Sequence, residues 1–176
     1  MDRDELGQRI YERAHLTGEF TLRSGTISNE YFDKYLFEGD PELLRDIAEL
    51  LAALVPDGTD AFAGLELGGV PLATALSHRT GLPTRFVRKE AKPYGTRRLA
   101  EGGNIDGMRL TIIEDVVTSG GQVVASCSDL RELGAIVETA LCVIDREAGG
   151  TEALAAIGVE LRPLYKMSEL TPSLPT

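Results

Sequence analysis

Two adjacent carboxylates and a turn of small residues are the features of this sequence best suited to chemistry. They lie in residues 110–122, LTIIEDVVTSGGQ, where Glu114 and Asp115 follow an apolar run and the turn 118–121 follows two valines. Backbone amides of a glycine-rich turn that opens a helix can bind a phosphate. Carboxylates suit hydroxyl groups or hydrated Mg²⁺. A phosphorylated ribose would suit both the carboxylates and the small-residue turn. The alternative interpretation is a strand end without a ligand, where the two acids are simply solvated.

Positive charge is concentrated in a second stretch, residues 84–98, TRFVRKEAKPYGTRR. It holds six of the 18 Lys and Arg residues and one acidic residue, although the net charge of the chain is −10. A solvated loop is the ordinary explanation for such a charge run. In an acidic protein, however, clustered cations beside a proline and a glycine suit a compact polyanion. The basic residues are Arg85, Arg88, Lys89, Lys92, Arg97 and Arg98.

The elements that position these residues are predicted by the hydrophobic pattern, in which strands and helices alternate. Helices are expected at residues 3–18, 40–58, 70–81, 121–135 and 151–158. Extended segments are expected at 20–35, and strands at 60–69, 83–89, 109–115, 136–145 and 159–165. Asp40 is the predicted N-cap of the second helix, and the two histidines, His15 and His78, fall in predicted helices.

This alternation predicts an α/β fold with a mostly parallel twisted sheet and helices on both faces. A chain of 176 residues that is 43% hydrophobic has room for one domain, so residues 1–176 are expected to form a single unit. Ligands of open α/β sheets bind beyond the carboxyl ends of the strands. Glu114 and Asp115 are expected at such an end.

Composition excludes several classes of protein. The negative net charge argues against a broad nucleic-acid-binding face, and no apolar stretch reaches the roughly 20 residues of a membrane span. The charged N-terminus lacks the apolar core of a signal peptide. Cys127 and Cys142 have neither metal-ligand nor redox spacing and are expected to be buried thiols, which favours a cytoplasmic location. Walker and G-x-G-x-x-G motifs are absent from the sequence.

Residues 110–122 closely resemble the phosphoribosyl-pyrophosphate (PRPP) signature of type I phosphoribosyltransferases. RKEAKPYG at 88–95 resembles the mobile loop of the orotate phosphoribosyltransferase family, and FTLRSGTISNEYFD, GLELGGVPLA and DREAGG resemble that family in the expected order. The resemblance covers nearly the whole chain. It implies the type I phosphoribosyltransferase fold with a small N-terminal hood, the hood and first helix at 1–40, and a mobile catalytic loop at 88–102.

The resemblance implies an enzyme of pyrimidine (UMP) biosynthesis that transfers the 5-phosphoribosyl group from PRPP to orotate, giving orotidine 5′-phosphate and pyrophosphate. Mg²⁺ is the implied cofactor, held mainly by PRPP and water. Glu114 and Asp115 would hold the ribose hydroxyls, residues 118–122 the 5-phosphate, and Gly68 and Gly69 the pyrophosphate. The implied catalytic residues are Lys89, Lys92 and Asp115. The implied PRPP-binding residues are Arg23, Gly68, Gly69, Arg88, Lys89, Lys92, Tyr94, Glu114, Asp115, Val116, Val117, Thr118, Ser119, Gly120, Gly121 and Gln122.

For orotate, the resemblance implies that Tyr31 and Phe32 cover the base while Thr118 and Arg146 meet its ring and carboxylate. A guanidinium can grip a carboxylate in a bidentate way, which would favour orotate over uracil. An ordinary salt bridge is the alternative for Arg146. In the family a loop lysine reaches the neighbouring subunit, which implies a homodimer with shared sites.

The chain departs from the family pattern at two places. Pro93-Tyr94 replaces the usual Asp-His of the loop, and a phenol stays neutral at pH 7. Arg23 replaces the usual lysine. Two alternatives to orotate transfer remain: transfer to another base, or a PRPP-sensing regulator without catalysis. A regulator would need a basic DNA-reading face, and outside residues 84–98 the sequence has none.

Overall fold

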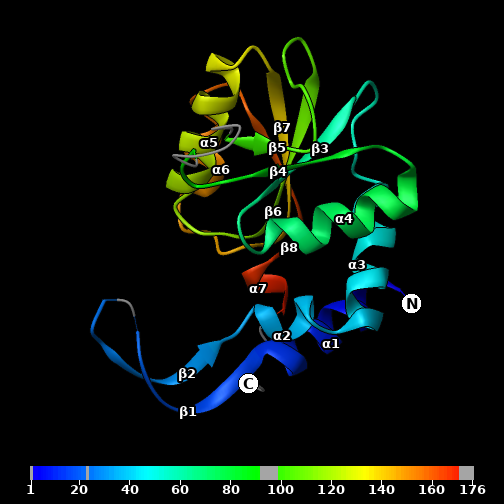
Figure 1. The fold of residues 1–176 in the computed structure, drawn as a ribbon. Coiled ribbons are helices and arrows are strands. Elements are labelled where there is room, and N and C mark those ends of the chain that lie inside the picture. Colours follow the sequence, from blue (N-terminus) through cyan, green and yellow to red (C-terminus); the bar gives the residue numbers. More distant parts are fainter. Residues whose placement is uncertain (1, 23, 92–98, 171–176) are drawn as a thin grey trace.

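The computed structural model describes residues 2–22, 24–91 and 99–170, and a six-stranded sheet forms its centre (Figure 1). The strand order is β5-β4-β3-β6-β7-β8. The strands are β3 (Ala61–Leu65), β4 (Thr84–Val87), β5 (Ala100–Glu101), β6 (Arg109–Val117), β7 (Ile136–Asp145) and β8 (Glu160–Lys166). Only the short edge strand β5 pairs antiparallel, with β4. The prediction of a mostly parallel sheet is therefore confirmed.

Helices cover both faces of this sheet, as predicted (Figure 1). On one face, α1 (Arg3–Ala14), α3 (Pro41–Ala52) and α4 (Gly69–Thr80) pack into a cluster that includes Ile113 of β6. On the other, α5 (Gly121–Glu132) and α6 (Gly150–Ala155) share a cluster with Ile112. Successive residues of a strand point to opposite faces of the sheet, so the apolar residues of β6 pack into both clusters.

A separate two-stranded antiparallel sheet, β1 (His15–Thr21) and β2 (Ile27–Phe32), extends away from the main sheet (Figure 1). The prediction that the first helix runs to residue 18 is wrong: α1 ends at Ala14, and His15 has extended backbone and pairs with Phe32. Cross-strand pairing therefore overrides the helical pattern here. His15 stacks on Tyr11 at a centroid distance of 4.8 Å, while His78 lies in α4 as predicted.

Local signals set the other helix ends. The Asp40 side chain accepts hydrogen bonds from the amides of Glu42 (3.1 Å) and Leu43 (3.2 Å), which confirms it as the N-cap of α3. Two short helices, α2 (Tyr35–Glu38) and α7 (Met167–Leu170), were not predicted. Among the described residues, no helix has the length and apolar character needed to cross a membrane.

The strand order creates a switch point between β3 and β6. The chain leaves β3 toward β4 on one side and leaves β6 toward β7 on the other. A crevice at the carboxyl ends of two such strands is the usual ligand site of an open α/β sheet. The strand predicted at 109–115 continues to Val117, so Glu114 and Asp115 lie two residues and more before its end rather than at it.

Candidate active site at the carboxyl ends of β3 and β6

The turn between β3 and α4 lies directly against β6. A Cβ atom added at Gly69 would collide with the carbonyl oxygen of Ile113, and one added at Gly68 would collide with the carboxylate of Asp115. Only glycine permits so close an approach. The structure thus brings Gly68 and Gly69, predicted to bind pyrophosphate, next to Asp115, predicted to bind ribose. A cis peptide bond joins Glu66 and Leu67 in the same turn.

The turn after β6 presents an uncapped helix N-terminus. Gly120 has a φ of 78°, in the left-handed region that favours glycine, and α5 begins at Gly121 without a side-chain cap. Thr118 and Ser119 are exposed beside it. Free amides at the positive end of a helix dipole, together with two hydroxyl groups, form an anion-binding arrangement. The binding of the 5-phosphate at this turn stays a prediction.

The paired carboxylates of β6 are buried, which contradicts the alternative interpretation of a strand end with solvated acids. Glu114 is 9% exposed and Asp115 has no exposed surface. The ammonium of Lys34 lies 2.5 Å from Oδ2 of Asp115. The carboxylate of Glu38 is buried nearby, and a Cβ at Gly68 would lie 2.9 Å from its Oε1. Lys34 and Glu38 were missed by sequence reasoning, although Lys34 directly follows the segment 31–33 and is one of four lysines in an arginine-rich chain.

The pKa values of these acids shift in opposite directions. Burial raises the pKa of Glu38 to about 9, together with a hydrogen bond to Asp115 and the negative charge of Asp115. Burial and the charge of Asp115 also raise the pKa of Glu114 well above its usual value. Burial alone would raise the pKa of Asp115, but hydrogen bonds from Glu38, Glu114 and Lys34 outweigh it and lower this pKa. The pKa of Asp115 is thus the one of the three that is lowered, which favours Asp115 as the ionised acid of the group.

The beginning of the basic stretch is fixed to the same turn. The amide of Lys89 donates a 3.0 Å hydrogen bond to Oε2 of Glu66, and the amide of Arg88 donates one of 2.9 Å to the carbonyl oxygen of Leu99. The guanidinium of Arg88 lies 3.6 Å from the carboxylate of Glu101. Lys92, Tyr94 and Arg23, also predicted to bind PRPP, lie outside the described residues.

The residues predicted to contact the base come from two places. The amide of Arg146, just after β7, donates a 2.8 Å hydrogen bond to the carbonyl oxygen of Val117, so Arg146 lies at the carboxyl end of the sheet, beside the turn 118–121. Tyr31 on β2 is 44% exposed. Phe32 packs instead against the core, with its ring 6.4 Å from that of Phe37. Successive residues of a strand point in opposite directions, so Tyr31 and Phe32 face different surroundings.

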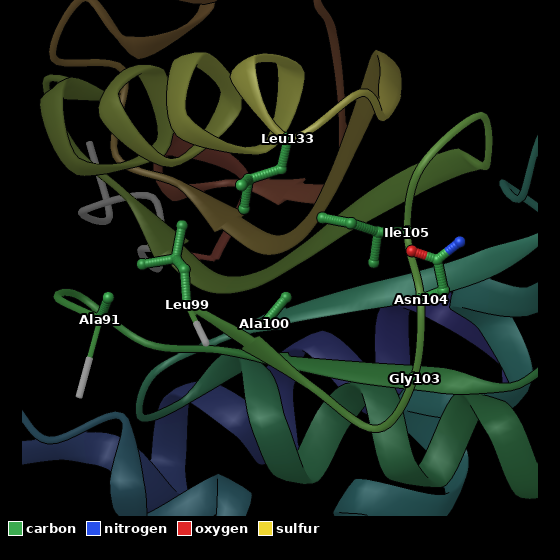
Figure 2. Close-up of a pocket in the computed structure, with 7 residues that line it drawn as sticks. All are labelled: Ala91, Leu99, Ala100, Gly103, Asn104, Ile105 and Leu133. Atoms are coloured by element: carbon green, nitrogen blue, oxygen red, sulfur yellow. The ribbon is translucent and has the colours of Figure 1, made fainter. Parts of the chain in front are cut away.

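An apolar cavity of about 310 Å³ lies elsewhere, between β5 and the carboxyl end of α5 (Figure 2). Figure 2 shows Leu99, Ile105 and Leu133 directed into it, with the Asn104 amide directed away. Its described lining has no cationic side chain, so this cavity does not suit a phosphorylated ligand. The cysteines line neither this cavity nor the crevice. Cys127 and Cys142 are free and buried, as predicted.

Comparison with known proteins agrees with this fold. Residues 37–157 match the family model of the phosphoribosyl transferase domain. An orotate phosphoribosyltransferase of Nocardioides sp. is 54% identical over 155 residues, covering 88% of this chain and 87% of that protein. Another, from Halobacterium salinarum, is 46% identical over 153 residues, with 87% of each chain covered.

Solved structures give the same result. The orotate phosphoribosyltransferase of Mycobacterium tuberculosis in complex with Fe(III) dicitrate superposes with a TM-score of 0.88 at 31% identity, covering 97% of this chain and 99% of that one. The same enzyme in complex with PRPP superposes with a TM-score of 0.82 at 28% identity, covering 97% and 99%. The fold and the crevice thus define a phosphoribosyltransferase. Within that class, the chain belongs to the orotate phosphoribosyltransferase family.

Proposed function

We propose that this protein transfers the 5-phosphoribosyl group of PRPP to orotate, with release of orotidine 5′-phosphate and pyrophosphate. One observation carries the proposal: the uncapped N-terminus of α5, the buried carboxylate of Asp115 and the Gly68-Gly69 turn converge at the switch point of the sheet. Their spacing suits a 5-phosphate, a ribose and a pyrophosphate in one ligand. The orotate phosphoribosyltransferases most similar to the chain support orotate as the acceptor.

The reaction needs alignment more than covalent chemistry. A ring nitrogen of orotate displaces pyrophosphate from C1 of the ribose through a transition state with oxocarbenium character. Holding both substrates in line supplies a large part of the rate enhancement. Charge that builds on the departing pyrophosphate requires cations, and we assign this task to Arg88, Lys89 and Lys92. The amides of Gly68 and Gly69 would bind the same leaving group.

We assign orotate recognition to Arg146 and Tyr31. The backbone of Arg146 is held beside Val117 and its side chain is exposed, which supports a contact of the guanidinium with the orotate carboxylate. Of the two aromatic residues Tyr31 and Phe32 on β2, Tyr31 has the exposed ring. The ring of Phe20 packs against it, with 5.5 Å between the two ring centroids. We also assign Thr118 to the orotate ring, whereas Phe32, which packs against the core, would act only by holding β2 in position. The hood at residues 1–40 and the catalytic loop at 88–102 also remain part of this proposal.

Mg²⁺ is the proposed cofactor. Among the described residues there is no group of three or more His, Cys, Asp or Glu side chains placed to hold a metal ion. The crevice fits an ion that is held by the pyrophosphate oxygens and by water, since Mg²⁺ keeps several water ligands when it binds phosphates. When bound, the ion would neutralise part of the leaving-group charge.

We further propose a homodimer in the cytoplasm. Large apolar side chains that the proposed site does not use are exposed, among them Leu67 in the turn after β3, at 62%, and Phe86 on β4, at 39%. Such side chains favour burial against a second subunit. The two buried free thiols are compatible with a reducing compartment.

The test is the PRPP-dependent loss of orotate absorbance, with uracil, adenine, guanine and hypoxanthine as alternative acceptors. Orotate should be consumed with stoichiometric release of pyrophosphate. Faster transfer to another base would replace orotate as the acceptor, and PRPP binding without transfer to any base would favour the regulator.

A further inference from the structure

Lys34 joins three parts of the chain that meet at the crevice. It lies between β2, which carries Tyr31, and α2, which carries Glu38. Its ammonium contacts Asp115 on β6 at 2.5 Å and lies 5.3 Å from the centre of the Tyr35 ring. The Lys34 side chain is 34% exposed, whereas Asp115 has no exposed surface. The carboxylate that would bind ribose therefore has a lysine partner that no family motif identified.

The surroundings of Asp115 make this partner necessary. Oε1 of Glu114 on β6 accepts a hydrogen bond of 3.0 Å from the amide of Asp115. The carboxylate of Glu38 on α2 is buried next to Gly68. On β7, the residue in register with Glu114 is Cys142, whose buried thiol has a raised pKa and is neutral. Three acids in so small a buried space cannot all ionise. An isolated buried carboxylate would itself take up a proton unless a cation met it.

We propose that Lys34 is a positioning residue for PRPP: its ammonium keeps Asp115 ionised as the acceptor for a ribose hydroxyl. The inference rests on the proposed function, because it takes Asp115 as the ribose ligand. Asp115 has no exposed surface, so a ribose hydroxyl can reach its carboxylate only when a side chain that covers it, such as the 34% exposed Lys34, moves. The same residue also connects the strand of Tyr31 to the PRPP signature.

The experiment measures PRPP affinity by calorimetry with Mg²⁺ from pH 5 to 8, without orotate. Without the cation, the pKa of Asp115 should rise, and Lys34→Gln should bind PRPP about tenfold more weakly at pH 7, with about tenfold further loss for each lower pH unit. Lys34→Arg should restore most of the affinity. Arg45→Gln removes an exposed charge from α3 and should bind as the wild type does. Titration of the PRPP phosphates is common to all variants and cancels in the comparison.

A double-mutant cycle separates charge from packing. In the Asp115→Asn background there is no carboxylate to keep ionised, so Lys34→Gln should change PRPP affinity less than about twofold there. Equal losses in both backgrounds would overturn the proposal. If Lys34→Gln folds only together with Asp115→Asn, charge pairing is supported. If it folds in neither background, Lys34 serves packing and the proposal fails.

This outcome is independent of the acceptor base. A wild-type protein that binds PRPP but does not consume orotate would refute the proposed reaction and leave the role of Lys34 open to the same binding test. Conversely, wild-type orotate turnover with unchanged PRPP affinity in Lys34→Gln would refute only the role of Lys34.

Discussion

The backbone amide of Lys89 donates a hydrogen bond of 3.0 Å to Oε2 of Glu66. Glu66 in turn uses its own amide to bond the carbonyl oxygen of Val87 at 2.9 Å. The two bonds tie the residues after β4 to the turn after β3, where Gly68 and Gly69 lie. The cations proposed for the leaving group therefore start from the same turn that would bind it.

Glu66→Ala should weaken this connection while the fold persists. We expect kcat/KM for PRPP to fall about fivefold, because one exposed hydrogen bond is worth about 1 kcal/mol. Steady-state kinetics with Glu66→Gln as the matched control measure the effect, since an amide oxygen can still accept from Lys89. Equal losses in both variants would assign the effect to charge rather than to the hydrogen bond.

Gly69→Ala should lower the free energy of unfolding by about 3 kcal/mol, the upper range for overpacking a close contact. The added methyl group would collide with the carbonyl oxygen of Ile113 and push β6 away from the turn between β3 and α4. Chemical denaturation measures the change. Gly121→Ala is the control for stability, because the nearest atom to a Cβ there is 4.0 Å away. Similar stabilities for the two variants would contradict the close packing.

The raised pKa of Glu38 predicts a pH-dependent stability. Folding raises this pKa from 4.5 to about 9, so the folded protein keeps a proton that the unfolded chain releases within that range. Stability should therefore fall as pH rises from about 4.5 to about 9, by at most about 1.4 kcal/mol per pH unit from this group. Glu38→Gln should flatten the dependence in denaturation experiments at pH 6, 7 and 8. Glu132→Gln, at an exposed place on α5, should retain the wild-type slope.

Arg146→Ala should raise the KM for orotate about 100-fold, because a bidentate pair with a carboxylate is among the strong hydrogen-bonded contacts. The KM for PRPP should change much less, since the backbone bond of residue 146 to Val117 survives the substitution. Arg79→Ala removes an exposed guanidinium that pairs with Glu49 on the distant α3–α4 surface and serves as control. A parallel rise in both KM values would place Arg146 with PRPP instead.

The proposed dimer can be tested by complementation. Lys89→Ala and Asp115→Asn proteins, each inactive alone, should recover about a quarter of wild-type activity when mixed, if Lys89 acts on the partner's site and subunits exchange at random. Subunit exchange is verified with differently tagged chains. Exchange without recovery would mean that each subunit uses its own Lys89.

Sequence patterns predicted the elements whose local signals are strong. Asp40 and Pro41 fixed the start of α3, Gly81 ended α4 at a φ of 80°, and the glycine turn opened α5. These depend on the backbone preferences of single residues and on short-range hydrogen bonds, so a short window of sequence contains them. The region 15–18 was misassigned because the pairing of His15 with Phe32 spans residues far apart in sequence.

The same distinction applies to the site. By itself the sequence determined which residue types could meet a phosphorylated sugar, because the carboxylates and the small-residue turn of 110–122 are contiguous. Only the tertiary structure decided how readily these carboxylates ionise. Lys34 and Glu38 reach Asp115 from about 80 residues away in the chain, and their contacts and burial raise the pKa of Glu38 while the pKa of Asp115 is lowered. Ionisation depends on what surrounds a group in space, and that is set only when the strands and helices have packed.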